Sequence, residues 1–121
     1  MTRSDDTLTA LRDALRRFAA ARDWQQFHTP KNLAMALSVE CAELLEHFQW
    51  LTAEQSAHLD ARTKRAVADE IADVLLYLTR LADVLDIDPV AAARRKMAVN
   101  ARKYPVRRAR GNARKYSARR A

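Results

Sequence analysis

Glu40-Cys-Ala-Glu43 and Glu70-Ile-Ala-Asp73 are two copies of one pattern, and the segment that holds them organises the chain. In each copy two carboxylates lie three residues apart within an apolar helical pattern, so both project from one side of a helix, one turn apart. Each pair borders an apolar stripe, formed by Leu33, Leu37, Cys41, Leu44 and Phe48 in the first case and by Val67, Ile71, Val74, Leu78 and Leu85 in the second. We therefore expect two packed helices with converging acids.

These acids need a neutralising partner, because an unpaired buried carboxylate costs several kcal/mol. Lys or Arg side chains from neighbouring helices are one solution, and divalent cations are the other. Repetition of the pair favours cations. Mg²⁺, with Mn²⁺ as an alternative, prefers oxygen ligands and keeps waters for substrate phosphates. The pattern thus predicts a metal site between the second and third main helices, formed by Glu40, Glu43, Glu70 and Asp73.

Composition favours an all-α fold. The 121 residues include one glycine and three prolines, and 49% of them are hydrophobic, which is sufficient for the core of a single domain. We expect a helical bundle of about four main helices, over residues 5–22, 30–49, 63–86 and 89–103, with a short helix within 52–60. Capping signals mark the helix starts, namely Ser4-Asp5-Asp6, Thr29-Pro30, Thr52 with Gln55, and Asp88-Pro89.

The single cysteine and the absence of long apolar runs indicate in which cellular compartment we expect the protein. Cys41 has no partner for an intramolecular disulfide, and its place in the apolar stripe predicts a buried small hydrophobic residue. The sequence contains neither a signal peptide nor an apolar run of about 18 residues. We expect a cytoplasmic protein without a membrane partner.

The basic charge is concentrated at the C-terminal end. Residues 1–100 carry 13 Lys or Arg and 15 Asp or Glu, whereas residues 101–121 carry nine basic residues and no acid. This shift in composition predicts a domain over 1–105 and a basic tail over 106–121. Such a tail is typical of contact with nucleic acid or another polyanion, or it reaches back to phosphates held by the domain.

Aromatic and polar residues outside the acid pairs add binding candidates. Trp24, Phe27 and His28 lie in an expected loop, where rings either close the end of a bundle or contact a ligand. Tyr77 follows Glu70 by two helical turns, as packing or as a substrate neighbour. The remaining candidates share one helical face, on which Lys96, Asn100 and Lys103 suit a polyphosphate.

A second apolar strip on the third main helix has a different expected role. Leu76, with Ala66 and Ala72 nearby, projects opposite the main stripe of that helix. This strip suggests a packing partner beyond the core, which we interpret as a contact between subunits.

The order of these motifs resembles the MazG-like all-α nucleoside triphosphate pyrophosphohydrolases. Two acid motifs about thirty residues apart on successive helices are similar to that family's pattern. The flanking segments are closest to its dCTP pyrophosphatase branch, through Arg22-Asp-Trp-Gln-Gln-Phe-His28, Phe48-Gln-Trp50, Asp73-Val-Leu-Leu-Tyr77 and Lys96-Met-Ala-Val-Asn-Ala-Arg-Lys-Tyr-Pro105. The resemblance runs from about residue 7 to 117, and it departs at Leu15, where a polar ring residue is expected.

The resemblance implies a Mg²⁺-dependent hydrolase that splits a nucleoside triphosphate, of the dCTP or modified pyrimidine type, into monophosphate and pyrophosphate. Metal binding is implied for the four acids. Nucleotide contact is implied for Trp24, Phe27, His28, Trp50 and Tyr77, and contact near the phosphates for Asn100, Lys103 and Tyr104. The family also implies a homo-oligomer, either a dimer or a tetramer.

Two other functions compete with this prediction. One is a basic-tailed helical module that binds nucleic acid without catalysis, and the other is a structural bundle with ion-paired acids. The slightly acidic body argues against nucleic acid as a partner, because such proteins place basic residues over a body surface.

Overall fold

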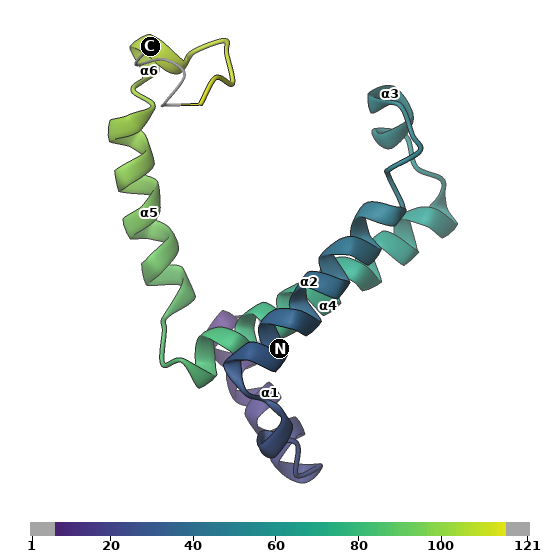
Figure 1. Ribbon diagram of the computed structural model, residues 1–121. Coiled ribbons are helices and arrows are strands. Elements are labelled where there is room, and N and C mark those ends of the chain that lie inside the picture. The colour runs from purple at the N-terminus through teal and green to yellow at the C-terminus, as the bar shows by residue number, and fades with distance from the viewer. Residues whose placement is uncertain (1–6, 116–121) are drawn as a thin grey trace. The chain divides into compact units, whose positions relative to one another are not determined.

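The computed structural model describes residues 7–115, in which every regular element is helical (Figure 1). The elements are α1 (Leu8–Ala21), the 3-10 turn η2 (Gln25–Phe27), α2 (Pro30–Glu46), α3 (Ala53–Ser56), α4 (Ala61–Val84), α5 (Pro89–Lys103) and α6 (Val106–Ala109). The predicted all-α class is confirmed. None of these helices is long and apolar enough to cross a membrane.

The predicted helix starts agree with the capping contacts. Thr29 and Asp88 cap α2 and α5, each followed by proline at the first helical position. Thr52 and Gln55 form the predicted capping box, with reciprocal bonds of 3.1 and 2.9 Å. Asp60 caps α4 by accepting a bond from the Thr63 amide.

The helix ends differ from expectation by a few residues. Thr7 caps α1, whereas the predicted cap at Ser4-Asp5-Asp6 lies outside the described residues. α2 ends at Glu46 rather than 49, because the backbone tightens there into three-residue turns such as Phe48 N–H to Leu45 C=O. α6, which follows Pro105, was not predicted.

The chain divides into two compact units, Met1–Ile87 and Asp88–Ala121. The first contains α1 to α4, and the second contains α5 and α6. The expected boundary after residue 105 places α5 with the first domain and stays a prediction.

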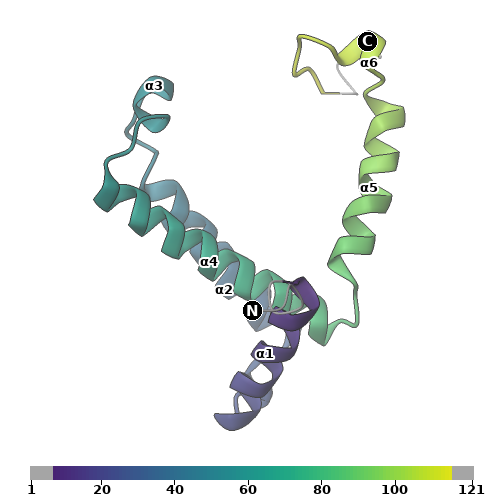
Figure 2. The ribbon, with the colours of Figure 1, turned by 180° about the vertical axis from the view of Figure 1, so that it is seen from behind.

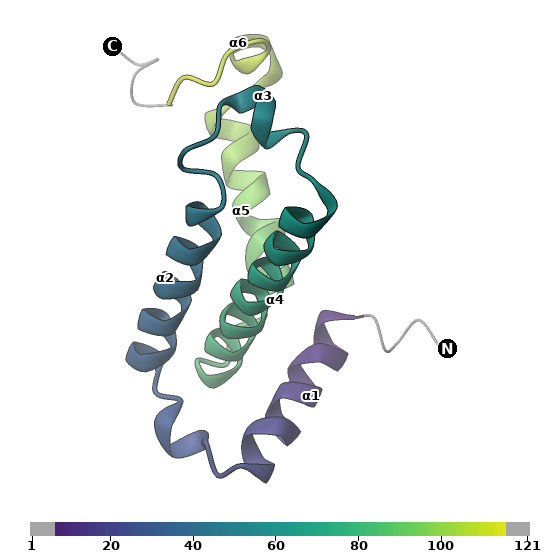
Figure 3. The same cartoon turned by 90° about the vertical axis from the view of Figure 1, so that its right-hand side faces the viewer.

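Within the first unit α2 and α4 run antiparallel along each other, as Figures 1 and 3 show. α1 packs against the C-terminal part of α4 (Figure 2). The buried apolar residues lie at these two contacts, and among the described residues they are Ala19, Leu33, Val67 and Ala82.

Two sequence interpretations of the α4 surface are wrong. The main stripe is not entirely core, because Ile71, Leu78 and Leu85 are 54, 45 and 47% exposed. Leu76 is half-buried and lines a cavity with side chains of α1, so its packing partner belongs to the same chain. α4 therefore uses the side near Val67 for α2 and the side near Leu76 for α1, and the rest of its stripe stays uncovered.

Cys41 is exposed, which corrects its predicted burial. Its stripe is wider than the contact between two helices, so Leu33 is covered while Cys41 lies at the margin.

An aspartate in the left-handed region ends both helices of the α1–α4 pair. Asp23 and Asp86 have φ of 53° and 55°, in the position that glycine commonly takes after a helix. The next amides close the turn, with Trp24 N–H to Ala19 C=O at 2.9 Å and Ile87 N–H to Ala82 C=O at 2.8 Å. The first of these turns fixes where the chain carries Trp24.

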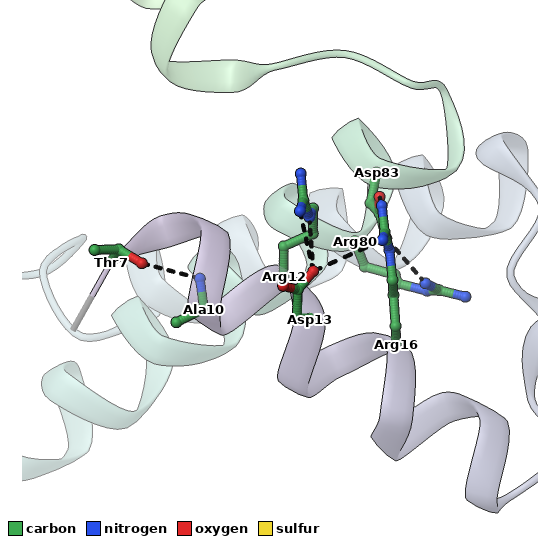
Figure 4. Close-up of polar contacts among 7 residues, drawn as sticks. All are labelled: Thr7, Ala10, Arg12, Asp13, Arg16, Arg80 and Asp83. Atoms are coloured by element: carbon green, nitrogen blue, oxygen red, sulfur yellow. Dashed lines mark hydrogen bonds and ion pairs between the residues drawn. The ribbon is translucent and has the colours of Figure 1, made fainter. Parts of the chain in front are cut away.

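Asp83 ties α1 to α4 through two arginines (Figure 4). Arg16 on α1 donates to both carboxylate oxygens, at 2.7 and 2.5 Å, and Arg80 on α4 lies 3.4 Å away. The side chains of Asp83 and Arg80 are 7 and 9% exposed, whereas that of Arg16 is 52% exposed. The Arg16 guanidinium holds the pKa of Asp83 below its usual range.

Asp83→Ala should destabilise the first unit by about 3 kcal/mol, because it leaves the buried Arg80 charge without a carboxylate. Arg16→Met should cost much less, since Asp83 keeps Arg80 and Arg16 is largely solvated. Urea unfolding followed by circular dichroism measures both. Asp69→Ala, at an exposed position of α4, is the matched control. Equal losses for Asp83→Ala and Arg16→Met would contradict this ordering.

Candidate functional site

Three of the four predicted metal ligands converge between α2 and α4. Glu40 and Glu43 come from α2 and Glu70 from α4, and one oxygen of each lies within 4.8 Å of the others. All three side chains are half-buried. The antiparallel contact produces this convergence, because it sets the middle of α2 beside the first half of α4.

Within the first unit, over residues 7–87, the three carboxylates have no cationic partner. The ion pairs there join arginines to Asp13 and Asp83 alone. One buried oxygen of Glu40 and one of Glu70 accept no hydrogen bond in the described residues. No lysine or arginine of the first unit therefore provides the ion-pair alternative of the sequence analysis.

The electrostatics follow from this crowding. Burial, followed by contacts with Glu70 and Glu43 and the charges of Glu43 and Asp73, raises the pKa of Glu40 to about 7. A carboxyl in this state is neutralised by a proton or by a metal ion. Carboxylate oxygens are the ligands that Mg²⁺ and Mn²⁺ prefer, so the donor set fits such an ion.

Asp73 lies outside the group of three and connects it to a cavity. It follows Glu70 by one turn of α4, its charge acts on Glu40, and it lines the cavity wall. The cavity has a volume of about 150 Å³. Its other walls come from α1, the following loop, the start of α2 and α4, through Leu15, Phe18, Ala19, Trp24, His28, Leu33, Leu76, Tyr77 and Arg80.

The cavity brings together three of the predicted base-binding residues. Trp24 contacts His28 edge to face with ring centroids 6.2 Å apart, and Phe18 contacts Trp24 in the same way at 5.7 Å. Tyr77 completes the ring wall from α4. The Thr29 cap and the bond from Asn32 Nδ2 to Phe27 C=O, at 3.1 Å, hold the loop that presents His28.

Two other candidates are exposed rings of the first unit, and four belong to the second unit. Phe27 and Trp50 are 59 and 86% exposed and do not line this cavity. Lys96, Asn100 and Lys103 are exposed on α5, and Tyr104 is half-buried at its C-terminal end. Their predicted roles stay predictions.

Sequence reasoning missed Arg80. This residue is 7% exposed, lines the cavity and donates from Nε to His28 Nδ1 at 3.1 Å. Its spacing, three residues after Tyr77 and three before Asp83, was the available signal.

A family profile covers the carboxylates and the α4 wall of the cavity, but not its walls from α1 and the loop. The profile described as the MazG-like family matches residues 35–118, more than half of the chain, including all four acids. The chain belongs to the MazG-like family. Its membership agrees with the resemblance inferred from the motifs.

Individual MazG-like relatives agree. The chain is 42% identical over 110 residues to dCTP pyrophosphatase 1 of Bos taurus. This alignment covers 89% of this chain and 65% of the relative. It is also 42% identical over 108 residues to dCTP pyrophosphatase 1 of Homo sapiens, and that alignment covers 88% of this chain and 64% of the relative. The chain thus spans about 65% of the length of these curated relatives. The crystal structure of a pyrophosphatase from Archaeoglobus fulgidus DSM 4304 has 51% identity and a TM-score of 0.73, over 77% of this chain and 87% of that one.

The pH dependence of stability tests the raised pKa of Glu40. The pKa of Glu40 is raised from 4.5 to about 7, so the folded protein holds this proton more tightly than the unfolded chain does. The resulting stabilisation is complete below pH 4.5 and is lost as the pH rises through 7. In metal-free buffer, wild type should therefore lose melting temperature relative to Glu40→Gln between about pH 5 and 8. Glu46→Gln, exposed on the same helix, should show a constant difference from wild type. A pH-independent difference for Glu40→Gln would contradict the assignment.

Proposed function

We propose that this chain is a Mg²⁺-dependent nucleoside triphosphate pyrophosphohydrolase acting on dCTP or a modified pyrimidine nucleotide. The observation that carries the proposal is the junction at Asp73 of a carboxylate cluster without cationic partners and an aromatic cavity. The names of the relatives support the reaction and the base. Such an enzyme draws on the nucleotide pool, so a cytoplasmic location remains part of the proposal.

In the proposed reaction, Glu40, Glu43, Glu70 and Asp73 would hold the metal, which lies beside the cavity. Mg²⁺ there would offset the charge of the phosphates and favour deprotonation of the attacking water. A carboxylate of the cluster accepts the proton of the attacking water.

The cavity rings receive the base in this proposal. Trp24 and Tyr77 supply flat apolar surface, and each base stack contributes about 1–3 kcal/mol. Lys96, Asn100 and Lys103 share one face of α5, and we assign them, with Tyr104, to the phosphates. Phe27 and Trp50 are exposed rings that we assign to the outer rim of the nucleotide site.

We further propose a homo-oligomer, a dimer or tetramer, formed through the uncovered side of α4. Ile71, Leu75 and Leu78 are 54, 42 and 45% exposed. With Leu85, which is 47% exposed, they follow one another at steps of four, three and seven residues, the spacing with which one helix packs along another. A second copy of the same helix offers the matching surface.

Glu43→Gln should lower pyrophosphate release by about 100-fold or more, because it keeps the side-chain shape and removes one metal-binding charge. The assay measures pyrophosphate and monophosphate from a panel of canonical and modified triphosphates with Mg²⁺. Glu46→Gln, one turn further along α2 and exposed, is the control and should retain activity. Mg²⁺ should raise the melting temperature of wild type but not of Glu43→Gln. Activity of Glu43→Gln within about twofold of wild type would reject the four-carboxylate site.

Leu78→Glu should dissociate the oligomer, because it sets a charge within the apolar contact. Light scattering of wild type should give a multiple of the 13.8 kDa chain mass, and that of the variant should approach 13.8 kDa. Arg65→Glu, exposed on another side of α4, should leave the mass unchanged. A monomeric wild type would refute this part of the proposal.

A further inference from the structure

Arg80 is a buried cation in the wall of the proposed base cavity, and its side chain contacts two residues. Its Nε donates to His28 Nδ1 at 3.1 Å, and its terminal nitrogen Nη1 lies 3.4 Å from Asp83. Asp83 is held more closely by Arg16, at 2.7 and 2.5 Å, and Figure 4 shows the two arginines around it. The shorter contact of Arg80 is thus the one to the histidine.

This contact determines the protonation of His28. A nitrogen that accepts a hydrogen bond carries no proton, so the ring is neutral and its proton lies on Nε2. Burial, followed by the charge of Arg80, lowers the pKa of His28 and favours the same neutral form. The other ionisable groups of this wall, Asp73 and Tyr77, lie on α4. His28 therefore has one N–H available as a donor.

A neutral histidine with Nε2–H, beside a guanidinium, makes this part of the cavity rich in donors. Cytosine has two adjacent acceptors, N3 and O2, on its pairing edge. Uracil and thymine carry N–H at position 3, so a donor of the base would face a donor of the wall. One buried N–H group would then lack a hydrogen-bond acceptor. Donors at this wall thus discriminate between pyrimidines that differ little in shape.

We propose that Arg80 is a positioning residue that holds His28 as an Nε2–H donor and thereby makes the cavity select a cytosine-type over a uracil-type base. The choice of base rests on the proposed function, whereas the tautomer of His28 does not. Arg80 acts through His28 and is not assigned to the reacting atoms.

The tautomer is tested in the free wild-type protein. Long-range ¹H–¹⁵N correlation spectra, assigned with His28→Gln, should show an unprotonated Nδ1 and a protonated Nε2. Arg80→Met removes the donor and should abolish this preference, while Arg65→Met should retain it. A wild-type ring protonated on Nδ1 overturns the proposal, even if Arg80→Met fails to fold.

Base selection is tested by the binding of dCMP and dUMP, measured by calorimetry with Mg²⁺. Arg80→Met should reduce the preference for dCMP by roughly tenfold. In the hydrolysis assay the change should fall on KM for dCTP, with kcat changed much less, because a purely structural defect would lower both. An unchanged dCMP preference in folded Arg80→Met overturns the proposal.

Different outcomes would refute the proposed hydrolase function and the proposed role of Arg80. Wild type that releases no pyrophosphate from any triphosphate refutes the proposed function, but nucleotide binding and the spectra still decide the role of Arg80. Conversely, active wild type with equal affinity for dCMP and dUMP refutes the base selection and leaves the hydrolase proposal intact.

Discussion

The uncompensated charge between α2 and α4 is the constraint on which the rest of the first unit depends. Glu40, Glu43 and Glu70 meet where a helix pair ordinarily places apolar side chains, and burial raises the pKa of Glu40 to about 7. The contact is maintained by apolar packing on either side of the acids, through residues such as Leu33 and Val67. A close-packed pair without these acids would be more stable. The helices therefore carry an electrostatic cost that only a bound cation or added protons relieve, as expected of a functional site.

Asp83 shows that the same chain neutralises a buried carboxylate fully where no ligand is needed. Two arginines lower its pKa, whereas burial followed by neighbouring carboxylates raises that of Glu40, although both acids lie on contacts between helices. The arginines also extend this network from α1 to the histidine of the cavity loop. One ionic cluster thus fixes the position of the cavity wall, and the other stays unsatisfied beside it. The partners of the two clusters differ, since Asp83 faces two arginines and Glu40 faces other carboxylates.

The sequence predicted the helices and the convergence of the acids well, because both depend on local spacing. Caps at Thr29, Thr52 and Asp88 mark helix starts through contacts within four residues. The sides of α4 were less predictable. A helical stripe shows which residues avoid water but not which neighbour covers them, so Ile71 and Leu76 were given the wrong roles. Arg80 escaped notice because an arginine on a helix is ordinarily solvated, and only the packing of α1 and the loop buries it.

The two uses of α4 lie next to each other in the chain. Glu70 and Ile71 are consecutive, so the carboxylate side and the exposed apolar stripe project about 100° apart from the same turn of the helix. Covering the stripe with a second copy would restrict the rotation and bending of α4, which carries two of the four proposed metal ligands. A ligand set that is held in place loses less conformational entropy when the metal binds. In the proposed oligomer, assembly therefore favours metal binding through a shared helix, without any residue of the stripe touching the ion.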